Sequence, residues 1–325
     1  MKPGRAEQSA TAADGAGDAL AMTPDTAATA NANATFADYF NLTKPRLSRL
    51  AAIISAVGYA MGSAPGRLSI PGIVHAFGAT FTVSAGAMAL NMYLERDLDG
   101  LMHRTRERPI PAGKVSAGAA LAVGIVLSVA GMAWLWIAGN ALAAFAGALA
   151  VASYVLIYTP MKRMTSLCTI VGAVPGALPP VIGYAAASGR IDFPCALLFA
   201  IMFLWQMPHF LAIAWMYRED YARAGMPMLT TQDVDGRMTA RQIVGYSVAL
   251  LLTSLLPGAG LLLPGAPVLA GWFYMAVALV SGVWFLGLGL RWMGTRDTPG
   301  ARKVFFASLL HITVLFVTLM VDKRP

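Results

Sequence analysis

The stretch that decides the fold covers residues 71–109 and reads PGIVHAFGATFTVSAGAMALNMYLERDLDGLMHRTRERP. Residues 71–94 are apolar over a length that suits an α-helix crossing a lipid bilayer, which takes about 20 residues. The residues that follow are densely charged. This junction predicts a transmembrane helix that ends in a polar cluster at one face of a membrane.

The composition of the whole chain also favours a membrane protein. Of its 325 residues, 57% are hydrophobic and only 12% are charged, about half the charged fraction of a soluble domain. Apolar stretches long enough to span a bilayer lie near residues 47–64, 71–94, 115–138, 141–158, 168–187, 193–216, 243–263, 267–290 and 304–321. We therefore predict an all-α fold, a polytopic transmembrane helical bundle of about nine spans. The split between the third and fourth spans depends on the short turn Ala138-Gly139-Asn140.

The N-terminal segment has a different composition. It is rich in Ala, Thr, Asp and Asn, and it lacks the apolar core of a secretory signal. We predict a disordered cytoplasmic tail over residues 1–40, followed by one transmembrane domain over residues 41–325. The two cysteines, Cys168 and Cys195, lie in or beside apolar stretches, so no disulfide framework is expected.

The distribution of the basic residues predicts the orientation of the chain. Of its 24 Lys and Arg residues, 20 fall on one side of the predicted spans. The other side holds only Arg67, Arg190, Lys323 and Arg324. Because basic loops stay in the cytoplasm, we predict the N-terminus inside and the C-terminus outside, in a bacterial cytoplasmic membrane. The net charge of +8 is then a topology signal, and nucleic-acid binding is not expected.

The first candidate site lies where the second span ends. Asn91, Glu95 and Asp99 are spaced four residues apart, which stacks their side chains on one face of a helix. Stacked carboxylates repel each other and lose hydration near the bilayer, and a divalent cation offsets both costs. Mg²⁺ prefers such oxygen ligands together with substrate phosphates. The alternative is a helix end whose charges snorkel to the membrane surface and pair with each other.

Basic residues suited to phosphate accompany this stack. Arg104 and Arg108 follow it directly, and guanidinium groups match the geometry of phosphate oxygens. Lys162 and Arg163 end the fourth span on the same side, where they would add charge for a diphosphate or serve only as membrane anchors. Carboxylates for a metal beside arginines predict a diphosphate site.

The second candidate site lies at the end of the sixth span. His209 is an intramembrane polar residue beside Pro208, which is expected to kink the helix. It is a candidate acid or base or a contact to a metalloporphyrin, unless it only hydrogen-bonds a neighbouring helix. Arg218, Asp220 and Tyr221 follow at the inside surface, where they could hold a second metal or the far end of a diphosphate.

Other intramembrane features carry less chemistry. His75 and His311 are interpreted as packing residues, because no charged cluster accompanies them. The run from Val174 to Gly183 contains several prolines and is expected to break the fifth span next to a cavity.

Together these features resemble the UbiA superfamily of intramembrane prenyltransferases, over roughly residues 40–320. The family motif N-x-x-x-D-x-x-x-D is present as Asn91, Glu95 and Asp99, with Glu in place of the middle Asp. The continuation M-x-R-T-x-x-R-P matches residues 102–109. Runs typical of the haem-farnesylating branch are P-H-F at 208–210, D-Y-x-x-A-G-x-P-M-L at 220–229 and A-L-P-P-V-I-G at 177–183.

The resemblance implies nine transmembrane helices around a central cavity that opens laterally to lipid. It implies Mg²⁺-dependent ionisation of farnesyl diphosphate and attachment of the farnesyl group to a vinyl group of haem B, giving haem O for terminal oxidases. Asn91, Glu95, Asp99 and Asp220 would then be catalytic. His209 and Tyr221 would lie on the haem side. A haem A synthase or oxidase assembly factors would be protein partners.

Two other functions fit parts of the sequence. A sister prenyltransferase would use an aromatic acceptor, against which the P-H-F run at 208–210 argues. A transporter would place ionisable groups near the bilayer midplane and often contains an internal repeat. The acidic groups of this chain instead gather at one face.

Overall fold

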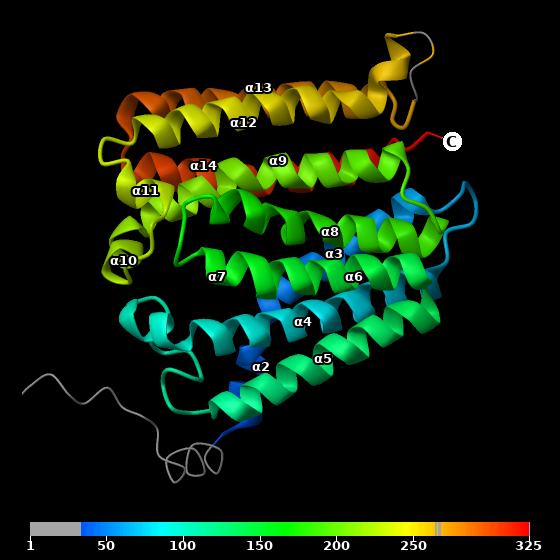
Figure 1. The fold of residues 1–325 in the computed structure, drawn as a ribbon. Helices are drawn as coiled ribbons and strands as arrows, with labels where there is room; N and C mark the ends of the chain where they lie inside the picture. The colour runs from blue at the N-terminus through cyan, green and yellow to red at the C-terminus, as the bar shows by residue number, and fades with distance from the viewer. Residues whose placement is uncertain (1–33, 264, 266–267, 325) are drawn as a thin grey trace, which may run out of the picture.

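A computed structural model describes residues 34–263, 265 and 268–324, and the predicted all-α bundle is confirmed over this part of the chain. In chain order the helices are α2 Phe36–Leu42, α3 Pro45–Gly62, α4 Ile70–Leu101, α5 Ala117–Ala138, α6 Ala141–Ala152, the π-helical turn η1 Ser153–Tyr158, α7 Thr159–Met161, α8 Cys168–Ser188, α9 Phe193–Met216, α10 Arg218–Arg223, α11 Leu229–Gln232, α12 Arg237–Leu255, the 3₁₀ turn η2 Leu256–Leu261, α13 Trp272–Thr295 and α14 Thr298–Val321. Figure 1 shows the long helices running side by side along one direction.

In the described part of the chain, eight helical segments, against about nine expected, are both long and apolar enough to cross a membrane. The segment that falls short is α3, whose 18 residues include Arg46 and Arg49. It nevertheless packs between α4 and α8 inside the bundle. The predicted turn at Gly139 is confirmed, because Asn140 caps α6 by accepting a 2.9 Å hydrogen bond from Ala143 N.

The boundary of the N-terminal tail needs correction. Helix α2 begins at Phe36, inside the tail predicted to end at residue 40. Thr35 and Asp38 form a capping box, in which each side chain accepts a hydrogen bond from the other residue's backbone N–H. Residues 1–33, the rest of the predicted tail, lie outside the described residues.

The proline-rich run does not break its span, contrary to the prediction. Helix α8 continues through Pro175, Pro179 and Pro180, all of which are buried. Membrane helices tolerate proline where neighbouring helices cover the freed backbone groups, and α3 and α9 both pack on α8. The contact with α3 is close: a methyl group added at Gly183 would meet the backbone of Ser55.

We therefore expect Gly183→Ala to push α3 away from α8 and to lower the free energy of unfolding by about 1–3 kcal/mol. Gly287→Ala on α13 is the matched control, because a methyl group there meets no atom within 4 Å. The control should keep or raise the stability, since Ala is the better helix former. Thermal unfolding in detergent measures both variants, and equal stability of the two would contradict this account of the α3–α8 contact.

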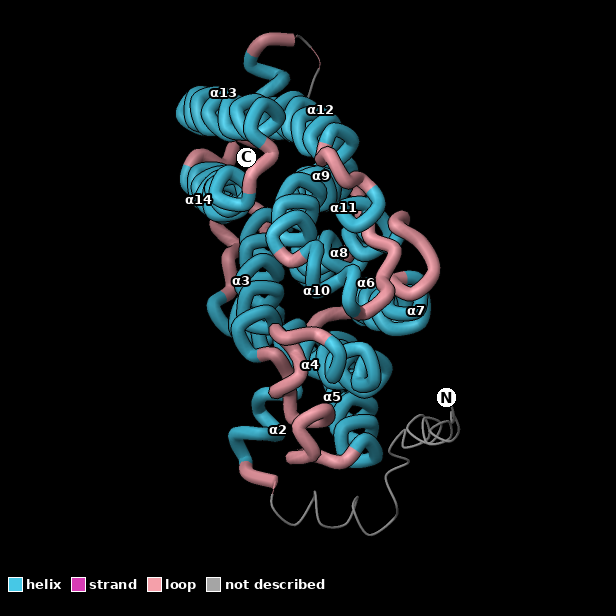
Figure 2. Tube along the Cα trace, turned by 90° about the vertical axis from the view of Figure 1, so that its left-hand side faces the viewer, coloured by secondary structure: helices cyan, strands magenta, loops and turns pink. Residues whose placement is uncertain are grey.

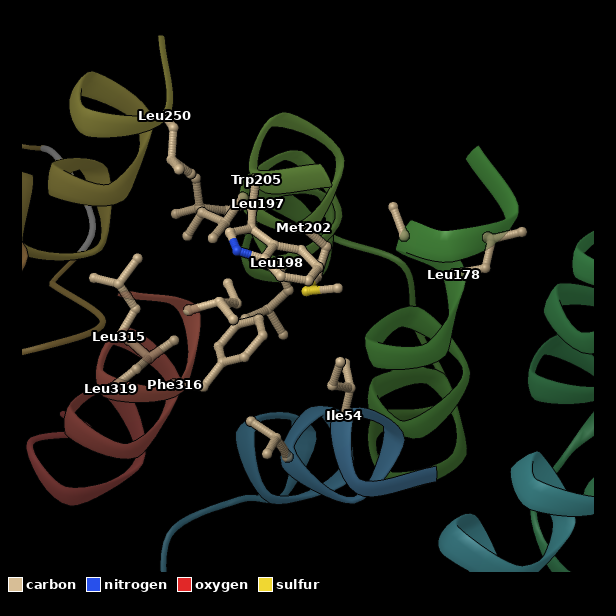
Figure 3. Close-up of a cluster of buried hydrophobic side chains, with 14 of the residues drawn as sticks. Ile54, Leu178, Leu197, Leu198, Met202, Trp205, Leu250, Leu315, Phe316 and Leu319 are labelled. Carbon is tan, nitrogen blue, oxygen red and sulfur yellow. The ribbon is translucent and has the colours of Figure 1, made fainter. Parts of the chain in front are cut away.

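Helix α9 lies at the centre of the core. It packs against α8, α12 and α14, and the view along the bundle in Figure 2 shows it surrounded by these helices. Figure 3 shows Leu198, Met202 and Trp205 of α9 beside Phe316 of α14 and Ile54 of α3. All five side chains are buried, so α9 supplies a rigid wall on which intramembrane polar groups can be placed.

The charged loops gather at one end of the bundle. The segment after α4 and helices α10 and α11 lie at the same end in Figure 1, and the C-terminus lies at the other. At that opposite end Lys323 Nζ donates hydrogen bonds to the backbone oxygens of Ala60 (3.0 Å) and Ser63 (2.6 Å). The two predicted candidate sites therefore open toward the same end.

Candidate active site

A cavity of about 460 Å³ lies among α3, α4, α8, α9 and the segment from α6 to Lys162. Most of its wall is apolar, and its polar residues include both predicted constellations. Its charged lining residues are Lys44, Glu95, Asp99, Arg104, Arg108 and Lys162. Four cations thus face two carboxylates, an excess of two positive charges, which favours an anionic ligand.

The predicted stack on α4 forms one wall of this cavity. Helix α4 continues through Asp99, so Asn91, Glu95 and Asp99 lie on one helical face, and all three are buried. Asp97, on the same turn, points away, and 71% of its side chain is exposed. The helical spacing read from the sequence therefore places three oxygen donors side by side.

Each member of the stack contacts one cation. Lys162 Nζ lies 2.6 Å from Glu95 Oε1, and Arg108 Nη1 lies 2.7 and 2.6 Å from the two carboxylate oxygens of Asp99. Lys44 Nζ donates a 2.7 Å hydrogen bond to Asn91 Oδ1. The carboxylates are thus neutralised, and the cations are held where a phosphate group could reach them.

Local structure positions the cations. Thr105 Oγ1 donates a 2.8 Å hydrogen bond to the backbone oxygen of Asp99, which folds the turn carrying Arg108 back onto the stack. The π-helical turn η1 brings Tyr154 and Tyr158 to the cavity wall. Lys162 Nζ lies 4.5 Å from the centre of the Tyr158 ring, a distance typical of a cation–π contact.

The two lysines differ in their electrostatics. Burial, with Arg108 nearby, lowers the pKa of Lys44 to about 7. Burial also acts to lower the pKa of Lys162, but the Glu95 carboxylate holds that pKa well above its usual value. Lys162 is therefore a fixed positive charge, whereas a bound anion would be needed to keep Lys44 fully protonated near neutral pH.

The donor set of the stack fits Mg²⁺ in part. Two carboxylates and one amide oxygen are hard donors, and Mg²⁺ commonly binds only one or two protein carboxylates plus phosphate oxygens and water. Within the described part of the chain, no group of three or more His, Cys, Asp or Glu residues lies close enough together to hold a metal. Phosphate oxygens of a substrate and water would complete the shell of a Mg²⁺ ion held by the stack.

His209 lies deeper in the same cavity, on α9. Its Nδ1 lies 2.8 Å from Ser308 Oγ of α14, so it does hydrogen-bond a neighbouring helix. Its ring stacks between Trp205 and Phe305, with centroid distances of 4.9 and 4.8 Å. Because His209 also lines the cavity, the packing and the functional interpretations of this residue are compatible.

Three predicted site residues do not join the cavity wall. The Asp220 carboxylate pairs with Arg223 at 2.7 Å within the short helix α10. Arg218 lies over the Trp215 ring at 4.3 Å, and Arg163 Nη2 donates a hydrogen bond to Leu94 O. Asp220 is therefore paired within its own helix and is not among the residues that line the cavity. Tyr221, one residue on, does line the cavity.

Several polar lining residues were not predicted from the sequence, among them Lys44, Tyr154 and Tyr158. Lys44 had been counted only as a topology charge, although it contacts Asn91, 47 residues away. Tyr154 lies within an apolar span, and Tyr158, at the end of that span, was given no role. The spacing of Tyr158 and Lys162, one turn apart at the end of a span, is the signal that could have indicated them.

Comparisons with known proteins agree on one family. The model of the UbiA prenyltransferase family matches residues 51–310. The protoheme IX farnesyltransferase of Solibacter usitatus is 44% identical over 294 residues, which cover 88% of this chain and 98% of that protein. A digeranylgeranylglyceryl phosphate synthase structure matches with a TM-score of 0.72 at 16% identity, covering 88% of this chain and 97% of that one.

A UbiA homologue from Archaeoglobus fulgidus, bound to GPP and Mg²⁺, matches with a TM-score of 0.62 at 15% identity. The match covers 87% of this chain and 99% of that one. At this identity the likeness concerns the fold. Together with the family model and the close relative, it shows that this multi-pass membrane protein belongs to the UbiA prenyltransferase family.

Proposed function

We propose that this chain transfers the farnesyl group of farnesyl diphosphate to a vinyl group of haem B, which gives haem O. One observation carries the proposal: the Asn91, Glu95 and Asp99 stack with its cations forms a charged end of a cavity whose wall is mostly apolar. A prenyl diphosphate has the same two parts, an anionic head and an apolar tail. The protoheme IX farnesyltransferases among the relatives support haem as the acceptor.

The cations of the cavity act on the leaving group. Breaking the allylic carbon–oxygen bond leaves negative charge on the diphosphate, and Arg104, Arg108 and Lys162 lie where they can hydrogen-bond its oxygens. Lys44 is the fourth cation that lines the cavity near the diphosphate. Mg²⁺ bound to the oxygens of Asn91, Glu95 and Asp99 would supply further positive charge at the departing diphosphate.

The apolar wall acts on the farnesyl group. An allylic cation is readily trapped by water, so the cavity must exclude water around the reacting carbon. The wall beside the stack is formed by side chains such as Ile54, Val83, Met88 and Met202. The farnesyl carbon bonds to the terminal vinyl carbon of haem, and one water adds to the adjacent carbon with loss of a proton. These two additions to the vinyl group account for every atom of the hydroxyethylfarnesyl side chain.

Two further polar lining residues belong to the haem side of the site in this proposal. His209 and Tyr221 line the cavity from α9 and α10. The ring of His209 lies among aromatic side chains, which suit the flat face of a porphyrin. Haem O would then pass to a terminal oxidase directly or through a haem A synthase.

Incubating the purified protein with haem B, farnesyl diphosphate and Mg²⁺, followed by mass analysis of the extracted haem, tests the function. We expect haem carrying a hydroxyethylfarnesyl group, formed only when all three are present. Consumption of farnesyl diphosphate with an aromatic acceptor, without change in haem, would contradict the haem assignment and favour a sister prenyltransferase.

We also propose that the charged end of the bundle faces the cytoplasm of a bacterial inner membrane, and that the helical part of the chain, from Phe36 of α2 on, acts as one catalytic domain. The uneven distribution of basic residues supports this orientation. An alkaline phosphatase fused after residue 325 should be active, because the C-terminus would lie in the periplasm, on the outer side of the inner membrane. An inactive phosphatase, with activity of a cytoplasmic reporter at the same position, would reverse the orientation.

A further inference from the structure

The side-chain oxygen of Ser308 contacts both His209 and a backbone oxygen, and a backbone oxygen can only accept a hydrogen bond. Ser308 Oγ donates a 2.6 Å hydrogen bond to Phe305 O and lies 2.8 Å from His209 Nδ1. A serine hydroxyl has one proton to donate and lone pairs to accept. Since the proton points to Phe305 O, the bond to the histidine requires Nδ1 to carry the ring proton. In the neutral ring, Nε2 then has a free lone pair.

We propose that Ser308 fixes His209 in its Nδ1-protonated tautomer, so that Nε2 offers a lone pair to the iron of a haem bound in the cavity. The inference rests on the proposed function, because it takes haem as the acceptor. His209 of α9 is then an axial ligand of the haem iron, and Ser308 of α14 is a positioning residue for it. Iron binds one nitrogen of a neutral imidazole, while the N–H of the other ring nitrogen donates a hydrogen bond to the protein.

Two further contacts hold the ring in place. Trp205 Nε1 donates a 2.6 Å hydrogen bond to Ser308 O, so one residue of α14 is bonded to both Trp205 and His209, one helical turn apart on α9. The rings of Trp205 and Phe305 lie on the histidine ring at interplanar angles of 26° and 28°. The stacking fixes the plane of the ring, and the hydrogen bond to Ser308 fixes which edge faces α14, because a half-turn of the ring would put a carbon in place of Nδ1.

The other ring nitrogen is available. Among the described residues, none makes a hydrogen bond with His209 Nε2, and the residue lines the cavity. The pair His311 and Ser281 provides a contrast within the same chain. Ser281 Oγ donates to Val277 O and lies 3.1 Å from His311 Nδ1, but His311 Nε2 is sealed in the protein without a partner there. His311 does not line the central cavity.

Nitrogen NMR of the full-length protein tests the tautomer without altering Ser308. The chain has four histidines, so ¹⁵N-histidine labelling gives few signals, and His209→Gln identifies one of them. We expect His209 to show a protonated Nδ1 and an unprotonated Nε2 before haem is added. A protonated Nε2 would overturn the proposal, whatever the activity of the protein.

Binding of ferric haem without farnesyl diphosphate tests the ligand. The wild-type protein should show the absorption and electron paramagnetic resonance spectra of histidine-ligated haem, and His209→Gly should lose them and regain them with added imidazole. Ser308→Ala should bind haem about 10- to 100-fold more weakly, the usual effect of losing such a hydrogen bond behind a ligand. Its fold should persist, because the Trp205 bond is to the backbone of Ser308.

Ser281→Ala is the matched control, since it removes the same hydrogen bond from His311. It should leave haem binding unchanged. Equal haem spectra and affinity in Ser308→Ala and the wild type would overturn the role of Ser308, while haem farnesylation by the wild type would leave the proposed function standing. If the wild type formed no farnesylated haem, the proposed function would fail instead.

Discussion

Replacing Asp99 with Asn should slow farnesyl transfer by about 10³-fold while the protein remains folded in the membrane. The Asp99 side chain is fully buried on the cavity wall, and Arg108 contacts both of its oxygens. Asn keeps one oxygen for Arg108, so packing is preserved, but it removes the negative charge that Mg²⁺ and the arginine both require. The rate of farnesylated haem formation at saturating farnesyl diphosphate measures the effect.

Asp97→Asn is the control for this substitution. Asp97 lies on the same turn of α4, but its side chain is exposed and its nearest cation is Arg96, at 3.8 Å. The control should keep its activity within about twofold, because such surface pairs contribute little. Near-normal transfer by Asp99→Asn, with a wild-type melting temperature, would contradict a role of the α4 stack in binding the metal and the diphosphate.

Elements governed by local spacing could be predicted from the sequence. The bounds of α9, Phe193–Met216, match the prediction because uninterrupted apolar residues lie between charged ends. The stack on α4 followed from a four-residue period, which depends only on helix geometry. Eight of the predicted spans are apolar enough to be found by composition alone, whereas α3 also contains Arg46 and Arg49 near its start.

Contacts between distant segments could not be predicted in this way. Glu95 and Lys162 are 67 residues apart. No local sequence pattern shows that Lys162, rather than its neighbour Arg163, pairs with Glu95. Lys162 enters the cavity while Arg163 binds the backbone of Leu94. For the same reason, the sequence could not indicate that Asp220 pairs with Arg223 within α10.

Replacing Lys162 with Met should both destabilise the protein and abolish transfer. The substitution leaves the Glu95 carboxylate, whose side chain is 5% exposed, without its 2.6 Å partner. Removing one member of a buried ion pair typically costs about 3–5 kcal/mol of folding free energy. Unfolding in mixed micelles should show a loss of this size, and Arg163→Met should show almost none, because Arg163 bonds only a backbone oxygen outside the cavity.

The double variant Glu95→Gln with Lys162→Met separates stability from chemistry. It removes both charges of the pair, so the stability lost in Lys162→Met should largely return. Transfer should not return, because the cavity still lacks a cation at the diphosphate and a carboxylate in the α4 stack. Recovery of both properties together would mean that the pair only holds α4 against α7, and the diphosphate would then depend on Lys44, Arg104 and Arg108 alone.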